Sequence, residues 1–261
     1  MKLITWNVNG VRARHAQLIE LMEREQPDVV CLQEIKASPS QVPEFPIHSP
    51  LSSDYRTYWH GNGGYSGVAL LVKRAVSPSF DVTHPAFDFE CRIATCVVNG
   101  VRIAATYVPN GGKDYDAKVR FLTDMAAWAE GLRANGEPLA ICGDLNVAFE
   151  DRDIHQKERK PNQIGTRPEE RALIGRLMDA GLVDVGRAMD PDNSYLFTWW
   201  PHWRNMRQRN IGWRIDYVLA SAPLGPAAVS CVSMREFGSS DHAPVMAVFR
   251  SEEHTSELQS H

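Results

Sequence analysis

Several stretches of the chain contain a continuous apolar run that is bounded by polar residues, which is the pattern of a strand that is buried on both faces. DVVCLQE (28–34), SGVALLVK (66–73) and PLAICGDLN (138–146) show it most clearly. Further strand-like runs lie at 3–6, 213–220, 228–236 and 243–250. The sequence therefore predicts a protein that is built around several buried strands.

Helices and a hairpin are predicted between these strands. The apolar positions have helical spacing at 11–26, 116–133 and 167–181. The last of these segments has Pro168 near its start and Gly181 past its end, as helices commonly do. In residues 91–108, Asn99 and Gly100 separate two apolar runs, which is the strongest short-range signal for a β-hairpin.

This mixture of hairpins and helices around buried strands indicates an α/β protein with two packed sheets and helices outside them. We expect residues 1–250 to form a single domain, because the sequence shows no internal repeat and no Gly/Ser linker. Residues 251–261 have almost no apolar side chains, so we expect a disordered or non-native tail there.

The composition limits the kinds of partner that the protein can have. Of 261 residues, 43% are hydrophobic and 23% are charged, and the formal net charge is −4. Any nucleic-acid site must therefore be a local basic patch rather than a general positive field. The five cysteines lack C-x-x-C spacing and fit buried, reduced thiols. With no signal-like N-terminus and no long apolar run, we expect a cytoplasmic protein outside membranes.

Polar residues follow the apolar strands at the points where the strands end. The clusters are Trp6-Asn7-Val8-Asn9, Gln33-Glu34, Tyr107-Val108-Pro109-Asn110, Gly143-Asp144-Leu145-Asn146 and Ser240-Asp241-His242. Because strand ends converge on one rim of a sheet sandwich, these clusters predict a cleft rich in Asn, Asp and Glu. Asp216 lies inside a strand-like run, where a charge is costly without a partner, and His242 is a candidate partner.

Such a cleft suits a hard divalent cation, because Mg²⁺ takes oxygen ligands and uses one or two carboxylates plus substrate phosphate. The sequence has neither the Cys/His spacing of a zinc site nor a Walker-type GxxxxGK[ST] motif. A metal together with an Asp–His pair suits hydrolysis of a phosphate ester. A single Asn or Asp after a strand is more often a turn former, so the inference depends on the whole set.

The chain resembles the exonuclease III family of apurinic/apyrimidinic (AP) endonucleases, within the endonuclease/exonuclease/phosphatase superfamily. The matching motifs are, in order, TWNVNGVRAR, PDVVCLQEIK, GYSGVALL, ATYVPNGG, CGDLNVA, NIGWRIDYVLAS and SDHAPV, from Thr5 to Val245. The resemblance implies a four-layered α/β sandwich of the DNase I type and Mg²⁺-dependent cleavage of DNA 5′ to an abasic site. It also implies 3′-phosphodiesterase, 3′-phosphatase and 3′→5′ exonuclease activities.

The resemblance implies a bound metal ion, Mg²⁺, for which Mn²⁺ can substitute. The residues that would surround this ion are Asn7, Asn9, Glu34, Asp144, Asn146 and Asp241. Glu34 corresponds to the principal ligand. Some members of the family have Asp where this chain has Asn9, so the number of metal ions stays open.

The resemblance also implies catalytic roles. Asp144 corresponds to the residue that orients or deprotonates the attacking water, and Asn146 corresponds to a positioner of phosphate or water. His242, held by Asp216, corresponds to the phosphate-binding histidine. Tyr107 falls where the family contacts the scissile phosphate.

Residues 197–215 are basic and aromatic, with four arginines, four tryptophans and no acidic residue. We expect arginines such as Arg204 and Arg209 to neutralise DNA phosphates without reading sequence. By resemblance, an apolar wall accepts a flipped-out baseless sugar and rejects a normal nucleotide. The wall residues are Trp199, Trp213 and Ile215. Asn110, Tyr65 and Lys113 are the other expected DNA contacts, although the last two could equally be ordinary solvated side chains.

The leading hypothesis is a monomeric DNA-repair phosphodiesterase that acts on duplex DNA with abasic sites or blocked 3′ ends. Two alternatives stay open. One is a superfamily phosphoesterase that acts on RNA or another phosphodiester, and the other is a DNA-binding protein whose catalysis has decayed.

Overall fold

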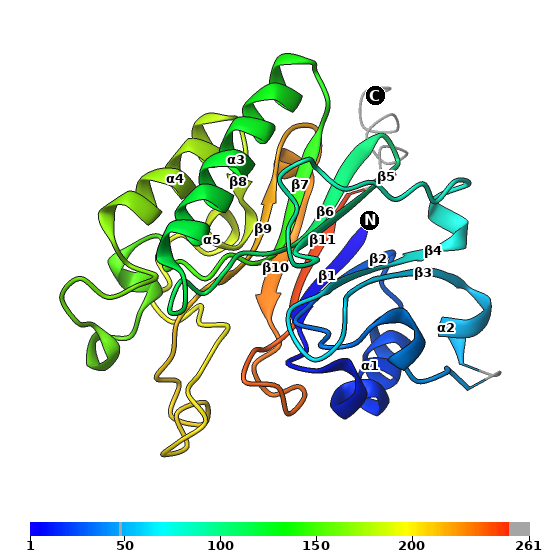
Figure 1. The fold of residues 1–261 in the computed structure, drawn as a ribbon, viewed down its shortest axis with the longest axis horizontal. Coiled ribbons are helices and arrows are strands. Elements are labelled where there is room, and N and C mark those ends of the chain that lie inside the picture. The colour runs from blue at the N-terminus through cyan, green and yellow to red at the C-terminus, as the bar shows by residue number, and fades with distance from the viewer. Residues whose placement is uncertain (47–48, 251–261) are drawn as a thin grey trace, which may run out of the picture.

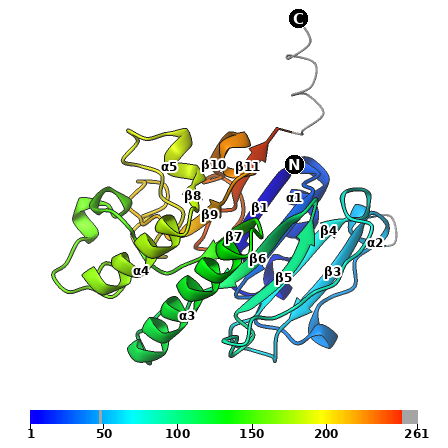
Figure 2. The same cartoon turned by 90° about the horizontal axis from the view of Figure 1, so that it is seen from above.

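Two β-sheets pack face to face, and helices cover the outer face of each (Figures 1 and 2). The structure is a computed structural model that describes residues 1–46 and 49–250. The predicted tail at 251–261 lies outside the described residues. None of the described helices combines the length and the apolar character that are needed to cross a bilayer.

The first sheet has the strand order β10-β11-β1-β2-β4-β3 in the described part of the chain. Its strands are β1 (Lys2–Asn7), β2 (Val29–Gln33), β3 (Tyr55–His60), β4 (Val68–Lys73), β10 (Ala228–Ser233) and β11 (Val245–Phe249). β1 and β2 are parallel, with Asn7 opposite Gln33, and β11 is antiparallel to β1. The carboxyl ends of β1 and β2 therefore meet the amino end of β11 at one edge.

The second sheet has the order β5-β6-β7-β9-β8. Its strands are β5 (Ile93–Val98), β6 (Val101–Tyr107), β7 (Leu139–Asp144), β8 (Val183–Asp184) and β9 (Asp216–Ala220). β6 and β7 are parallel, with Tyr107 opposite Asp144, and β9 is antiparallel with Asp216 opposite Asp144. This register places the side chains of Tyr107, Asp144 and Asp216 at one edge of the second sheet.

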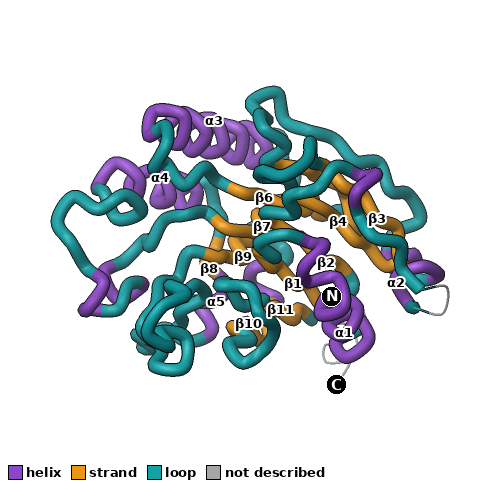
Figure 3. The backbone as a smooth tube through the Cα atoms, turned by 60° about the horizontal axis from the view of Figure 1, so that its bottom comes forward, coloured by secondary structure: helices purple, strands orange, loops and turns teal. Residues whose placement is uncertain are grey.

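The main helices are α1 (Val11–Glu25), α2 (Pro50–Ser53), α3 (Tyr115–Ala134), α4 (Pro168–Asp179) and α5 (Val185–Met189). α1 packs on the first sheet and α3 with α4 on the second (Figure 2). A buried apolar layer that includes Leu70, Ile103 and Ala247 lies between the sheets. These layers confirm the predicted four-layered α/β sandwich. Figure 3 brings forward the edge where the strand ends meet and shows loops in front of them.

The predicted hairpin and all three long helices are present. Asn99 and Gly100 both have positive φ, 49° and 74°, as a two-residue turn between twisted strands requires. The run at 213–220 is a strand only from Asp216, so Asp216 begins β9 instead of lying inside a strand. The reason is that Trp213 pairs with Trp199, which draws the preceding residues away from β7.

Close approach of β6 and β7 generates a test of the fold. A Cβ added to Gly143 would lie 1.8 Å from the carbonyl oxygen of Thr106 on β6. We expect Gly143→Ala to lower the free energy of unfolding by at least about 2 kcal/mol, because backbone has to move. The control is Gly131→Ala in α3, where an added Cβ would meet nothing within 4 Å. This substitution should stabilise the helix by about 1 kcal/mol. Urea unfolding of both variants measures this, and equal stability of Gly143→Ala and the parent would contradict it.

Candidate active site

A cavity of about 570 Å³ opens where the strand ends of both sheets meet. Its polar lining includes Asn7, Glu34, Tyr107, Asp144, Asn146 and His242, with Asn110 and Asp241 beside them. Glu34 and His242, which are more than 200 positions apart in the sequence, thus line one space. The predicted convergence of polar clusters on one rim is confirmed by this geometry.

Asp144, Asp216 and His242 form a buried group at the floor of the cavity. His242 Nδ1 lies 2.9 Å from Asp216 Oδ2, and His242 Nε2 lies 3.8 Å from Asp144 Oδ2. Thr198 Oγ1 donates a 2.6 Å hydrogen bond to the same Asp216 oxygen. Thr198 was not anticipated from the sequence, although its place beside Trp199 offered a weak signal. The contacts leave Nε2 as the imidazole atom that points toward Asp144.

The charges of this group depend on one another. Burial alone would lower the pKa of His242, but the carboxylates of Asp216 and Asp144 raise it to about 10. Burial, reinforced by Asp216, raises the pKa of Asp144 to about 7 despite the opposing effect of His242. The site therefore holds a persistent imidazolium next to a carboxylate that titrates near neutral pH, a combination suited to anion binding and proton transfer.

Two amide groups fix the Asp144 carboxylate. Asn7 Nδ2 donates to one oxygen at 3.0 Å, and the backbone N–H of Asn146 donates to the other at 2.9 Å. Asn146 has a φ of 51°, in the left-handed region that Asn tolerates better than most residues, and its side-chain amide donates to Val108 O. Asp144 is thereby held in one orientation toward the cavity.

A fully buried ion pair supports this part of the site from below. Lys118 Nζ lies 2.6 Å from Glu170 Oε1 and donates to the backbone carbonyls of Asn146 at 2.7 Å and Asn110 at 3.4 Å. Burial lowers the pKa of Lys118, and Glu170 opposes that shift. The sequence carried a signal for Lys118, because it falls on the apolar face of α3 at helical spacing from Phe121.

Glu34 lies at the mouth of the cavity and offers oxygen ligands. Its φ is 54°, an uncommon conformation for a non-glycine residue, and it turns the chain at the end of β2. Lys36 Nζ lies 3.0 Å from Glu34 Oε1 and 2.7 Å from Asn9 Oδ1. Asn9 Nδ2 in turn donates to Asp241 Oδ1 at 2.8 Å. Glu34, Asn9 and Asp241 thus belong to one connected polar set.

The donor set is one that suits a hard cation. Asp144, Asp216 and His242 offer atoms within 4.8 Å of one another, a spacing compatible with a metal. However, His242 Nδ1 is already occupied by Asp216, and the raised pKa of the ring opposes its use as a metal ligand. The carboxylate of Glu34, with neighbouring amide and carboxylate oxygens, fits Mg²⁺ better because every donor there is oxygen.

One wall of the cavity is apolar. It consists of Trp199, Trp213 and Ile215, joined by Ile164, which the sequence analysis missed. Trp199 and Trp213 meet edge to face with ring centroids 6.0 Å apart. Trp199 Nε1 donates to Asp241 Oδ2 at 2.9 Å, whereas buried Trp213 Nε1 has no protein partner among the described residues. The wall can therefore shield a small apolar group.

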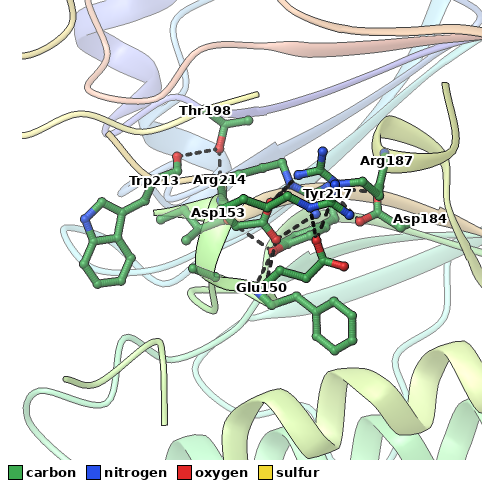
Figure 4. A network of polar contacts seen from close by, with 12 residues as sticks. Glu150, Asp153, Asp184, Arg187, Thr198, Trp213, Arg214 and Tyr217 are labelled. Atoms are coloured by element: carbon green, nitrogen blue, oxygen red, sulfur yellow. Dashed lines mark hydrogen bonds and ion pairs between the residues drawn. The ribbon is translucent and has the colours of Figure 1, made fainter. Parts of the chain in front are cut away.

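A buried ion network anchors this wall (Figure 4). Arg214 grips Asp153 with two hydrogen bonds of 2.8 and 2.9 Å and reaches Asp184 at 2.7 Å. Side chains alternate along extended backbone, so Trp213 and Ile215 face the cavity while Arg214 faces the network. A slip of one residue would turn both wall residues away, and the network opposes that slip.

The predicted DNA contacts outside the cavity fall in two places. Tyr65 and Lys113 line a neighbouring cavity of about 800 Å³, which shares Asn110 with the first. Arg204 and Arg209 are exposed on the loop after Trp200 and line neither cavity. The other two arginines of this segment are already engaged. The half-buried Arg207 donates to backbone carbonyls between β10 and β11, and the buried Arg214 donates to Asp153.

Comparison with known proteins agrees with this geometry. The sequence profile of the endonuclease/exonuclease/phosphatase family matches residues 4–242. An exodeoxyribonuclease of Bacillus subtilis is 32% identical over 94% of this chain and 98% of its own length. Among solved structures, a 3′ phosphatase from Neisseria bound to a product DNA hairpin has a TM-score of 0.85 and 29% identity. An AP endonuclease from Archaeoglobus fulgidus has a TM-score of 0.85 and 27% identity. Each of these two solved structures matches over 96% of this chain and 100% of its own chain.

The Asp216–His242 pair generates a test by titration. The folded pKa of His242 is raised above its usual 6.5 to about 10. The stability contributed by the pair is therefore full below about pH 6.5 and is lost as pH rises toward 10. We expect Asp216→Asn to lower the pKa of His242 by roughly 1–3 units, because an adjacent opposite charge is removed. NMR titration of the imidazole C–H resonances with a chelator present measures the pKa of His242. Asp124→Asn on the exposed side of α3 should leave it unchanged, and an unshifted pKa in Asp216→Asn would contradict the assignment.

Proposed function

The chain belongs to the endonuclease/exonuclease/phosphatase family, and on this basis we propose that it is a Mg²⁺-dependent DNA-repair phosphodiesterase that cleaves duplex DNA 5′ to abasic sites. As a member of the exodeoxyribonuclease and AP endonuclease group, it is a hydrolase of phosphodiester bonds. The proposal extends to 3′-phosphodiesterase, 3′-phosphatase and 3′→5′ exonuclease activity. Residues 1–250 would act as one domain and as a monomer.

One observation carries the proposal. Asp144 and His242, the latter paired with the buried Asp216, line the same cavity as Trp199, Trp213 and Ile215. A phosphate at His242 would place its attached sugar against that wall. A sugar without a base fits such a wall, whereas a normal nucleotide brings a base that needs additional space.

The nucleophile is a water molecule that Asp144 orients and deprotonates. The pKa of Asp144, about 7, allows this carboxylate to accept a proton at neutral pH. Asn7 and Asn146 hold its two oxygens, so the carboxylate does not rotate during the reaction. In-line attack then requires the scissile phosphorus to lie beyond that water, close to His242.

Charge on the phosphoryl oxygens is balanced by donors from several strands. The His242 imidazolium supplies a positive charge, and Asp216 keeps its Nδ1 occupied so that Nε2 faces the phosphate. Burial and the carboxylates of Glu34 and Asp144 raise the pKa of Tyr107, so its phenol stays protonated and donates a hydrogen bond. Asn110 lies on the exposed side of the cavity and supplies a further amide donor.

Glu34 would hold the cation, with Asp241 and the amide oxygens of Asn7 and Asn9 nearby. Mg²⁺ bound there would supply Lewis-acid stabilisation of the phosphoryl group and of the leaving oxygen. The exposed Arg204 and Arg209 would contact phosphates of the duplex away from the reacting centre, together with Lys113 and Tyr65. These outer contacts position the duplex without reading its sequence.

The proposal predicts incision of a duplex that carries one tetrahydrofuran abasic analogue when Mg²⁺ is present. Asp144→Asn should reduce the rate by about 10²–10⁴-fold, because the base is lost, while binding of the same duplex is retained. Asp179→Asn, an exposed carboxylate at the end of α4, is the matched control. Gel analysis of the products and a binding titration measure both quantities. Lack of incision by the parent at every Mg²⁺ or Mn²⁺ concentration would refute the function, and equal activity of Asp144→Asn would refute the role of Asp144.

The apolar wall predicts a change in substrate preference. Trp213→Ala opens the cavity, so we expect incision at the abasic analogue to fall about tenfold relative to removal of undamaged 3′ nucleotides. Tyr195→Ala removes an exposed ring that does not line the cavity and serves as control. The ratio of kcat/KM values for the two substrates is the measurement. A ratio that matches the control would show that Trp213 does not select the sugar.

A further inference from the structure

Lys36 lies on two oxygens that the proposed metal site would use. We propose that Lys36 competes with the divalent cation for the oxygens of Glu34 and Asn9, so that the lysine must be displaced for the cation to bind and thereby limits its affinity. This inference rests on the proposed cation site at Glu34. It does not depend on the substrate or on the reaction.

The geometry places the ammonium group in the mouth of the site. Lys36 Nζ is 3.0 Å from Glu34 Oε1 and 2.7 Å from Asn9 Oδ1. A cation such as Mg²⁺ binds oxygen at about 2.0–2.1 Å, so a cation on these oxygens would lie in close contact with Nζ. Two positive charges at such a separation repel strongly, so a cation on Glu34 Oε1 and Asn9 Oδ1 would favour withdrawal of the ammonium.

Backbone hydrogen bonds fix the position of the Lys36 Cα, whereas the side chain beyond it can move. Lys36 N donates to Ser66 O at 2.9 Å, and Ile35 N donates to Gly67 O at 3.1 Å. Lys36 and Glu34 both have positive φ, 50° and 54°, so the turn presents both side chains to the same rim. The Lys36 side chain is one-third exposed, so its ammonium can leave the site along a flexible stem into water.

Glu34 differs in this respect from the other carboxylates of the rim. The Asp144 oxygens accept from amides, and the Asp241 oxygens accept from Asn9 and Trp199. Asp216 is paired with His242, whose ring is buried and cannot withdraw. Asp241 Oδ2 also lies 3.5 Å from Nε2 of the exposed His202. Among the described rim carboxylates, Glu34 is the one that pairs with a lysine ammonium on a flexible stem. That makes it the position where an intramolecular charge is exchanged most easily for a metal ion.

The displaced lysine would also release Asn9. Asn9 Oδ1 accepts from Lys36 while its Nδ2 donates to Asp241, so the amide links the lysine to the second carboxylate. When Lys36 leaves, Asn9 Oδ1 becomes available as an oxygen donor next to Glu34. The lysine therefore controls two of the proposed metal residues together.

The test is direct measurement of Mn²⁺ binding to chelator-treated full-length protein without DNA, by electron paramagnetic resonance of free Mn²⁺ and by calorimetry. We expect Lys36→Met to bind Mn²⁺ about tenfold more tightly than the parent, because a charge-assisted hydrogen bond to the carboxylate no longer has to be broken. The matched control is Lys73→Met. Lys73 follows Val72, which pairs with Val29 at the opposite end of β2, and its loss should not change the affinity. Unchanged or weaker binding in Lys36→Met would overturn the proposal.

A second measurement uses the unaltered protein. Labelling with an amine-reactive reagent, read by mass spectrometry, should show that Mn²⁺ raises the reactivity of Lys36 several-fold and leaves Lys73 unaffected. Equal labelling of Lys36 with and without Mn²⁺ would overturn displacement. Both measurements are independent of DNA cleavage. Tighter Mn²⁺ binding in Lys36→Met together with no nuclease activity in the parent would refute the proposed function alone. Nuclease activity in the parent together with unchanged Mn²⁺ affinity in Lys36→Met would refute this inference alone.

Discussion

The hydrogen bond between His242 and Asp216 joins the two sheets at the point where both open to solvent. His242 precedes β11 of the first sheet, and Asp216 begins β9 of the second. Asn7 and Asp144 repeat this arrangement, because the donor ends β1 and the acceptor ends β7. The site is therefore the polar edge of an otherwise apolar interface between sheets. Buried charges are tolerated there because each is paired across the interface, and separation of the sheets would leave them unpaired.

The sequence predicted the residues at strand ends well, and the reason is geometric. A buried strand must end where the apolar run ends, so a polar residue such as Asp144 or Glu34 is placed on a rim by local pattern alone. The four-layered fold and the pairing of His242 with Asp216 followed from the same pattern together with the family resemblance. The start of β9 at Asp216 was not predictable, because it depends on the pairing of Trp213 with Trp199.

Contacts between distant segments could not be read in the same way. Lys118 and Glu170 come from different helices, and nothing local shows that one neutralises the other beneath Asn146. The arginines of the basic segment look alike in the sequence, yet Arg214 is held by Asp153 while Arg204 is exposed. Composition therefore overstated the charge available for phosphates, and the aromatic wall depends on that internal arginine.

The adjacency of β1 and β11 has a consequence for the order in which the molecule becomes complete during synthesis. The ribosome makes β1 well before β11, yet the two strands are neighbours, with Met1 N bonded to Phe249 O. A nascent chain already contains Glu34 and Asp144 long before His242 and β11 emerge. A chain that has not yet reached β11 therefore lacks the Asp216–His242 contact that joins the two sheets.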